Sequence, residues 1–160
     1  MKGVAVFDMG GVKGETTIED VTGGLQLRSF FTELPSGQHG FHIHTNGDLR
    51  GEGCMGACSH FHKGAPCPHG GAPGSKGPRH TGDLGNIEKT NHTYSYKLAG
   101  VKVDELLGRT LIVHADPDDL GEGTEADSKT TGHSGKRISC AIFGRAKDCE
   151  TPRQTRKKRR

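Results

Sequence analysis

Short apolar runs recur along the chain, and each alternates with polar positions and is bounded by turn residues. A period of two is typical of a β-strand with one buried face, and no run shows a convincing helical period. The pattern therefore predicts an all-β sandwich or barrel. The expected strands lie within 3–7, 15–21, 25–34, 39–45, 83–90, 92–101, 108–116 and 137–146.

Two long polar segments, about 46–82 and 117–136, interrupt this pattern. Long loops inside a compact domain are uncommon and usually functional. The first is rich in glycine, proline, cysteine and histidine. The chain has 160 residues, the size of one domain, and its 26 glycines fit a fold with many turns.

Charge divides the chain unevenly. Residues 145–160 hold eight basic and two acidic residues, which leaves 14 basic and 17 acidic residues in the rest. We predict a domain at 1–146 and a basic, disordered tail at 147–160. Such a tail is either simply solvated or binds polyanions weakly.

The N-terminal apolar run, Val4 to Phe7, is too short for the core of a signal peptide, and no segment is long enough to span a membrane. We therefore predict a cytoplasmic protein with no membrane partner.

The chain has five cysteines, so at least one has no intramolecular disulfide partner. A cytosolic chain usually keeps its cysteines reduced.

The segment "GFHIH" places His42 and His44 two residues apart. On a strand both imidazoles would point to one face and Ile43 to the other. Imidazoles suit zinc, copper and iron, and a carboxylate is compatible with zinc. Seven ligands are too many for one tetrahedral ion and about right for two ions that share one ligand. The candidate ligands are His42, His44, His60, His69, His80, Asp83 and His114.

Six ordered segments resemble the copper–zinc superoxide dismutase family. A lone pair of histidines is weak evidence, but the whole set keeps the family's order and near-family spacing over roughly 4–144. The segments are "GFHIH", "SHFH", "HGG", "RHTGDLGNI", "IVHADPDDLGEG" and "GKRISCAIFG".

The resemblance implies an eight-stranded Greek-key β-barrel, a sandwich of the immunoglobulin-like kind, with the active site between two long functional loops. It implies that His60 bridges the two metals, and that Asp118 links a copper histidine, His42, to a zinc histidine, His69. By the same resemblance, copper is held by His42, His44, His60 and His114, and zinc by His60, His69, His80 and Asp83.

The resemblance also implies a catalytic cycle of Cu(II) and Cu(I) that converts superoxide to oxygen and hydrogen peroxide, in antioxidant defence. Arg137 corresponds to the arginine that guides the anion, and Lys129 and Lys136 are expected to help. Cys54 and Cys140 correspond to the family's intramolecular disulfide.

A homodimer is implied as well, because Leu107 and Ile142 keep apolar character at interface positions. Asn46 and Arg145 place polar or charged groups where the family has apolar ones. An isologous interface would repeat each change on both subunits.

Two other interpretations remain open from the residues. Cys54, Cys58, His60 and His62 could form a finger-like zinc module, and the basic tail would then suggest a nucleic-acid binder. That module lacks the usual spacing and leaves three histidines unexplained. The other interpretation is an inactive or copper-handling relative, which would typically lack a copper ligand or the last arginine.

Several residues have no assigned ligand role. Cys58 and Cys67 are either free thiols or a second clamp across the first long loop. His62 stands where the family usually carries asparagine and is expected not to bind a metal. Three more histidines, expected on the surface or in loops, are His39, His92 and His133.

Overall fold

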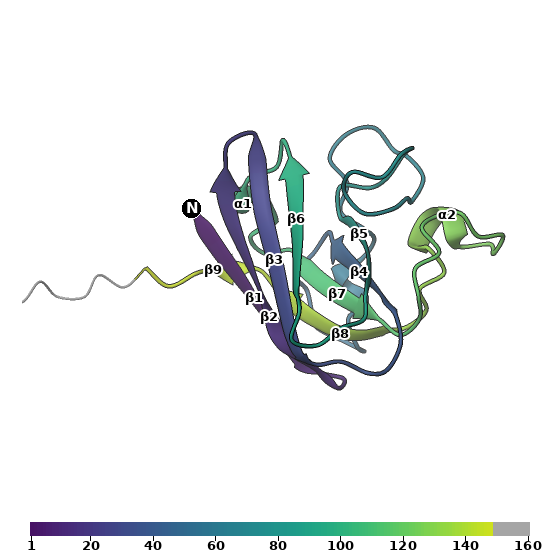
Figure 1. Cartoon of the computed structure of the whole chain (residues 1–160), viewed down its shortest axis with the longest axis horizontal. Helices are drawn as coiled ribbons and strands as arrows, with labels where there is room; N and C mark the ends of the chain where they lie inside the picture. Colours follow the sequence, from purple (N-terminus) through teal and green to yellow (C-terminus); the bar gives the residue numbers. More distant parts are fainter. Residues whose placement is uncertain (149–160) are drawn as a thin grey trace, which may run out of the picture.

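The structure is a computed structural model that describes residues 1–148, and its main elements are β-strands (Figure 1). Each of the eight longer strands overlaps one of the eight segments predicted from the alternating pattern, but β1, β2 and β3 begin one to three residues earlier than predicted and β1 ends two residues later. Their bounds are β1 Lys2–Met9, β2 Val12–Val21, β3 Gly24–Glu33, β4 His39–His44, β5 Asp83–Ile87, β6 Thr93–Ala99, β7 Thr110–His114 and β8 Arg137–Ile142.

Two antiparallel sheets pack face to face, which confirms the predicted all-β class. The first has the order β6-β3-β2-β1-β9, and the second has the order β5-β4-β7-β8. The short β9 (Gly144–Arg145) pairs with β1, whereas β8 pairs with β7. The chain therefore changes sheets at Phe143, whose side chain is buried in the core.

The core lies between the sheets and contains a row of aromatic rings. Phe41 of β4 lies 5.8 Å from the ring of Phe31 in β3 and 6.3 Å from Tyr96 in β6. Phe41 and Ile43 belong to this core cluster, so alternation along β4 turns His42 and His44 to the opposite face. All six residues of β4 are nevertheless buried, because the long loops cover that outer face.

Three short helical turns were not predicted from the sequence. They are η1 (Met55–Ala57), α1 (Val103–Leu106) and α2 (Ser128–Thr131). A single turn is too short to show a helical period. The two long loops contain η1 and α2 respectively, and the loop with α2 projects from one end of the sandwich (Figure 1).

Among the described residues, none of the helices is long and apolar enough to cross a membrane. The strands end at Arg145, and most of the predicted tail, with Cys149, lies outside the described residues. The boundary at 146 and the disorder of the tail therefore stay predictions.

Candidate metal centre

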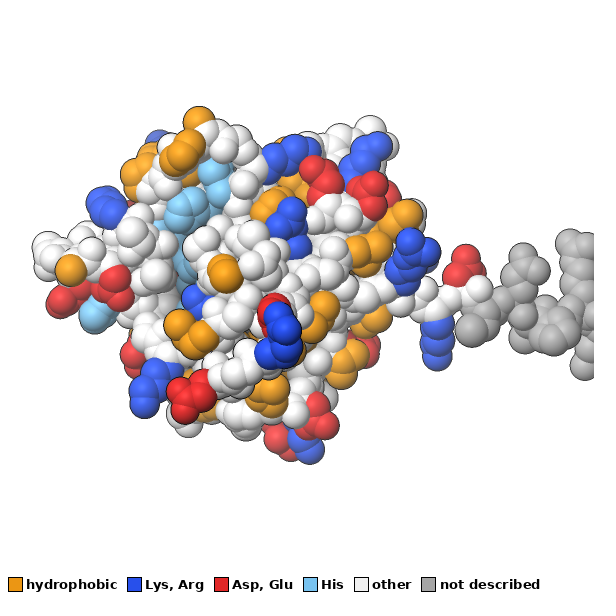
Figure 2. All heavy atoms as spheres, turned by 180° about the vertical axis from the view of Figure 1, so that it is seen from behind, with side chains coloured by type: hydrophobic (Ala, Val, Ile, Leu, Met, Phe, Trp, Pro, Cys, Tyr) orange, Lys and Arg blue, Asp and Glu red, His pale blue; other side chains and the backbone are white. Residues whose placement is uncertain are grey.

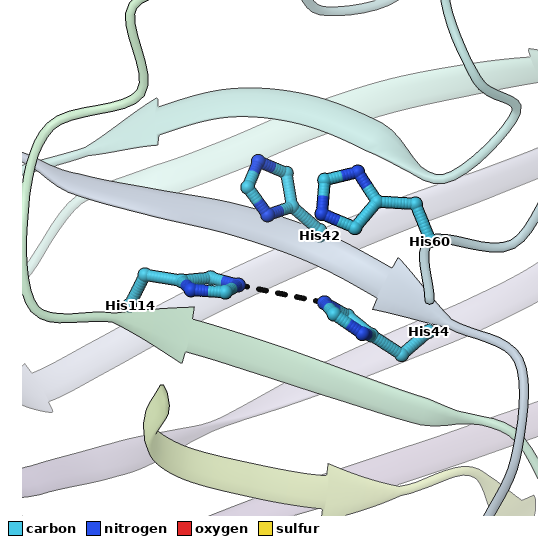
Figure 3. Close-up of side chains that lie close together, drawn as sticks. All are labelled: His42, His44, His60 and His114. Atoms are coloured by element: carbon cyan, nitrogen blue, oxygen red, sulfur yellow. Dashed lines mark hydrogen bonds between the residues drawn. The ribbon is translucent and has the colours of Figure 1, made fainter. Parts of the chain in front are cut away.

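Two neighbouring strands and the first long loop bring four histidines together (Figure 3). His42 and His44 lie on β4, and His114 ends the adjacent β7. His60 joins them through an isolated bridge to His44. One ring nitrogen of each lies within 4.8 Å of those of the others, so the four rings can surround one ion.

Hydrogen bonds fix which nitrogen of two rings faces inward. His44 donates from Nδ1 to the carbonyl of Cys58 at 2.7 Å, and His114 donates from Nδ1 to the carbonyl of Gly135 at 3.1 Å. In neutral rings both Nε2 atoms then carry lone pairs. These two atoms face each other at 3.4 Å, so a cation between them would satisfy both lone pairs.

The other two rings of this set offer lone pairs to the same space. His42 donates from Nε2 to Asp118 Oδ2 at 2.7 Å, and its Nδ1 is buried without a hydrogen-bond partner. The Nε2 of His60 is likewise buried without a partner. Unpaired buried nitrogens are costly, so these two, beside the facing Nε2 atoms of His44 and His114, fit a metal ion.

A second group surrounds a carboxylate oxygen, Asp83 Oδ1. The Nδ1 atoms of His60 and His69 lie 2.9 Å from it, and that of His80 lies at 3.4 Å. The Nδ1 atoms of His69 and His80 have no hydrogen bond of acceptable geometry despite these short distances. Three nitrogens and one carboxylate oxygen that converge, with two of the nitrogens lacking a hydrogen bond, fit the tetrahedral N₃O set of zinc.

The outer atoms of this second group are held by the protein. Asp83 Oδ2 accepts hydrogen bonds from the backbone N–H groups of Gly70 at 3.0 Å and His80 at 2.7 Å. His80 donates from Nε2 to the carbonyl of Cys67 at 2.8 Å. Oδ1 of Asp83 and Nδ1 of His80 therefore remain for a metal.

His60 belongs to both groups. Its Nδ1 faces Asp83 and its Nε2 faces the first set, so its two nitrogens point at two different ions. Asp118 also connects the two groups, because its Oδ2 accepts from His42 and its Oδ1 from His69 at 2.8 Å. This is the link implied by the resemblance.

Two residues that support Asp118 were missed from the sequence. Asn86 donates to the Asp118 carbonyl at 2.9 Å and accepts from its N–H at 2.7 Å. Gly132 has φ +71°, and a Cβ there would collide with Asp118 and His69. Nothing local in the sequence marks either role, because both depend on contacts between distant loops.

Burial keeps the first set in its neutral, metal-binding form. It is the main cause that lowers the pKa of His42, His44 and His60, and it lowers the pKa of His114 to about 4. His69 differs: burial lowers its pKa, but the hydrogen bond to Asp118 and the nearby negative charge of Asp83 outweigh burial and raise the pKa to about 9. A proton and a metal thus compete for Nδ1 of His69.

Arg137 begins β8 opposite His114 in the sheet. Its guanidinium donates to the carbonyls of Cys54 at 2.9 Å and Cys58 at 2.6 Å. The Cys58 carbonyl is the one that also accepts from His44, so Arg137 and His44 meet at one atom. Burial lowers the pKa of Arg137, but a guanidinium stays charged at any working pH.

The predicted disulfide is confirmed. Cys54 and Cys140 are bonded across 86 residues of sequence, and the bond joins the first long loop to β8. Cys58 and Cys67 are both free, so they do not form a second clamp.

The finger-like zinc module is not formed. Cys54 is used in the disulfide, and no group of three or more candidate ligands in residues 1–148 contains a cysteine.

The prediction that His39 lies on the surface or in a loop is wrong. It begins β4, is 3% exposed, and its ring nitrogens face the carbonyls of His114 and Pro35, each at 2.9 Å. His92 and His133 are exposed, as expected.

The ammonium of Lys129 donates a hydrogen bond to the carbonyl of Gly121, which holds that charge against the loop backbone.

Fold and site together define a class of protein: an antiparallel β-sandwich that carries two adjoining metal sites with one shared histidine. A sequence profile described as copper/zinc superoxide dismutase matches residues 12–143. The chain belongs to the copper/zinc superoxide dismutase family, whose members bind copper and zinc and convert superoxide to oxygen and hydrogen peroxide.

Named relatives agree with this assignment. The chain is 41% identical over 152 residues to a superoxide dismutase [Cu-Zn] of Paramecium bursaria Chlorella virus 1, covering 91% of this chain and 79% of that protein. It is 45% identical over 129 residues to an extracellular superoxide dismutase [Cu-Zn] of Haemonchus contortus, covering 75% and 67%. The crystal structure of the clock protein EA4 superposes with a TM-score of 0.77 at 33% identity, covering 91% and 94%.

Proposed function

We propose that His42, His44, His60 and His114 hold copper, that His60, His69, His80 and Asp83 hold zinc, and that this chain dismutates superoxide at the copper set. The observation that carries the proposal is the convergence of unpaired inner nitrogens in two groups that share His60. Metal analysis of the purified protein beside a superoxide assay tests it. We expect one copper and one zinc per chain; a fully loaded, active protein with zinc alone would contradict it.

The residues divide the chemistry between them. When bound, copper supplies reversible one-electron exchange and zinc supplies a cation without redox chemistry. His60, fixed by Asp83 at Nδ1 and unpaired at Nε2, can hold a proton at Nε2 for the peroxide product. His42 and His69 are kept in one orientation by Asp118.

Arg137 is the proposed guide for the substrate anion, and its replacement should slow capture. It carries a fixed charge beside His114 and the Cys58 carbonyl. A charge at a cleft can raise association rates by about 10-fold to 1000-fold, so Arg137→Ile should lower the second-order rate by about ten-fold or more. Arg137→Lys should retain much of the rate, because it keeps the charge.

The ionic-strength dependence of the rate separates guidance from structural damage. Arg137→Ile also removes three hydrogen bonds to carbonyls of the first loop. We expect the second-order rates of the parent and of Arg137→Lys to fall as the salt concentration rises, and that of Arg137→Ile to fall less. Pulse radiolysis with metal content measured in parallel would decide. An isoleucine variant with the parent's rate and salt slope would rule out guidance.

We further propose a homodimer. Ile142 of β8 is 39% exposed, which leaves apolar surface beside the last strand. Asn46 and Arg145, the two polar residues at positions where the family has apolar ones, are also exposed. Light scattering over a range of concentrations should give twice the chain mass. A monomer at every concentration would overturn the dimer.

The cytoplasmic location and polyanion binding by the tail stay predictions.

A further inference from the structure

The first long loop carries a histidine and a cysteine that the two metal groups do not use. The Nε2 atom of His62 lies 3.5 Å from the Sγ atom of Cys67. Cys67 is a free thiol and partly buried. A hydrogen bond from its sulfur to the carbonyl of Arg79, at 3.4 Å, fixes the direction of the thiol proton. The sulfur's lone pairs are thus left toward His62.

Both side chains line a cavity of about 630 Å³ that reaches the zinc-type group. The same cavity is lined by His60 and His80. The rings of His62 and His80 lie 5.6 Å apart, so the pair sits just outside that group. In Figure 2, histidine side chains gather in a hollow on this face of the molecule. A cation in the cavity would therefore meet His62 and Cys67 beside the inner ligands.

The spacing of the two atoms suits a shared cation. Zinc–sulfur and zinc–nitrogen bonds of ordinary length place the two ligand atoms about 3.5 to 3.6 Å apart across a tetrahedral ion. The observed distance of 3.5 Å already matches this value. Thiolate with imidazole is the donor pair that zinc and other thiophilic ions prefer.

We propose that His62 and Cys67 form an outer site for one thiophilic d¹⁰ cation of the zinc class, with water completing the coordination. Binding releases the thiol proton of Cys67 to solvent. The ring proton of His62 moves from Nε2, which now donates to the Ala65 carbonyl at 2.8 Å, to Nδ1, which has Thr81 Oγ1 at 3.4 Å.

The outer site is weaker than the buried group. Two side chains bind instead of four, and occupancy gives up the hydrogen bond of His62 to Ala65. The backbone N–H of Thr81, which now donates to Nδ1 of His62 at 3.2 Å, must also find another acceptor. The site therefore holds a cation transiently at the approach to the zinc-type group.

Cadmium added to the copper- and zinc-loaded protein tests the site without relying on activity. A Cys58→Ser/Cys149→Ser parent leaves Cys67 as its one free thiol. We expect one added cadmium per chain by equilibrium dialysis, an ultraviolet thiolate-to-cadmium absorption, and unchanged zinc content. Cys67→Ser should abolish the absorption. His62→Asn should weaken binding by about ten-fold or more, as for lost metal-site contacts.

A matched control is His92→Asn, because His92 is exposed, meets Tyr94 edge to face, and belongs neither to the metal groups nor to the cavity lining. It should bind cadmium as the parent does. Three results would each overturn the outer site: absorption that persists in Cys67→Ser, a His62→Asn variant that binds as tightly as the parent, or cadmium that enters only as zinc leaves. The proposed copper and zinc ligands could still be correct in all three cases.

Discussion

Replacing His60 with alanine is expected to impair both metal groups and to lower activity by about 100-fold or more, the range for loss of a positioned proton-transfer group. His60 alone contributes a nitrogen to each group, Nε2 to one and Nδ1 to the other. The variant leaves each group one ligand short. Asp83 also loses one of the three nitrogens around its Oδ1 atom.

Metal content of the purified variant, measured for copper and zinc separately, provides the decisive comparison. His44→Ala should lower copper more than zinc, and His80→Ala should lower zinc more than copper, because each contributes to one group. His62→Ala should leave both contents nearly intact, since neither group includes it. A His60→Ala protein that keeps a full complement of both ions would show that the shared ligand is assigned wrongly.

The strands were predictable because their burial is local and periodic. Along β3 the positions Leu25, Leu27, Ser29 and Phe31 are buried in alternation, and the sequence displays this pattern at the start of the strand. β4 differs, because its second face is buried by loops rather than exposed to water. Here the sequence signal was chemical: two histidines on one face next to a core phenylalanine.

The supporting contacts of the site could not be predicted from local patterns. His39 is buried because two carbonyls from distant segments meet its ring, and Asn86 acts through the backbone of Asp118. The role of Cys58 is similar. Its carbonyl accepts hydrogen bonds from His44 and Arg137. The backbone φ of Cys58 is 61°, a value that residues with a side chain rarely adopt. Such roles require the three-dimensional arrangement of both long loops.

Removal of the Cys54–Cys140 disulfide is expected to lower the free energy of unfolding by about 4.5 kcal/mol, from the chain-entropy cost of closing a loop of this length. The bond spans 86 residues, so it constrains much of the unfolded chain. Both half-cystines are buried in a small cluster with Ala57 and Ile112. Cys54→Ser/Cys140→Ser would also place two hydroxyls there, which adds to the loss.

Urea unfolding of the metal-free proteins measures this effect without the added stability that bound ions give. Cys58→Ser/Cys67→Ser is the matched control, because it replaces two cysteines that form no disulfide. It should change stability far less. Reductant should lower the free energy of unfolding of the parent and of the control to about that of the disulfide variant. It should leave the disulfide variant unchanged. Because the bond holds Cys54, whose carbonyl accepts from Arg137, the loss should also loosen the first loop beside β8. A disulfide variant within about 1 kcal/mol of the parent would contradict the loop-entropy estimate.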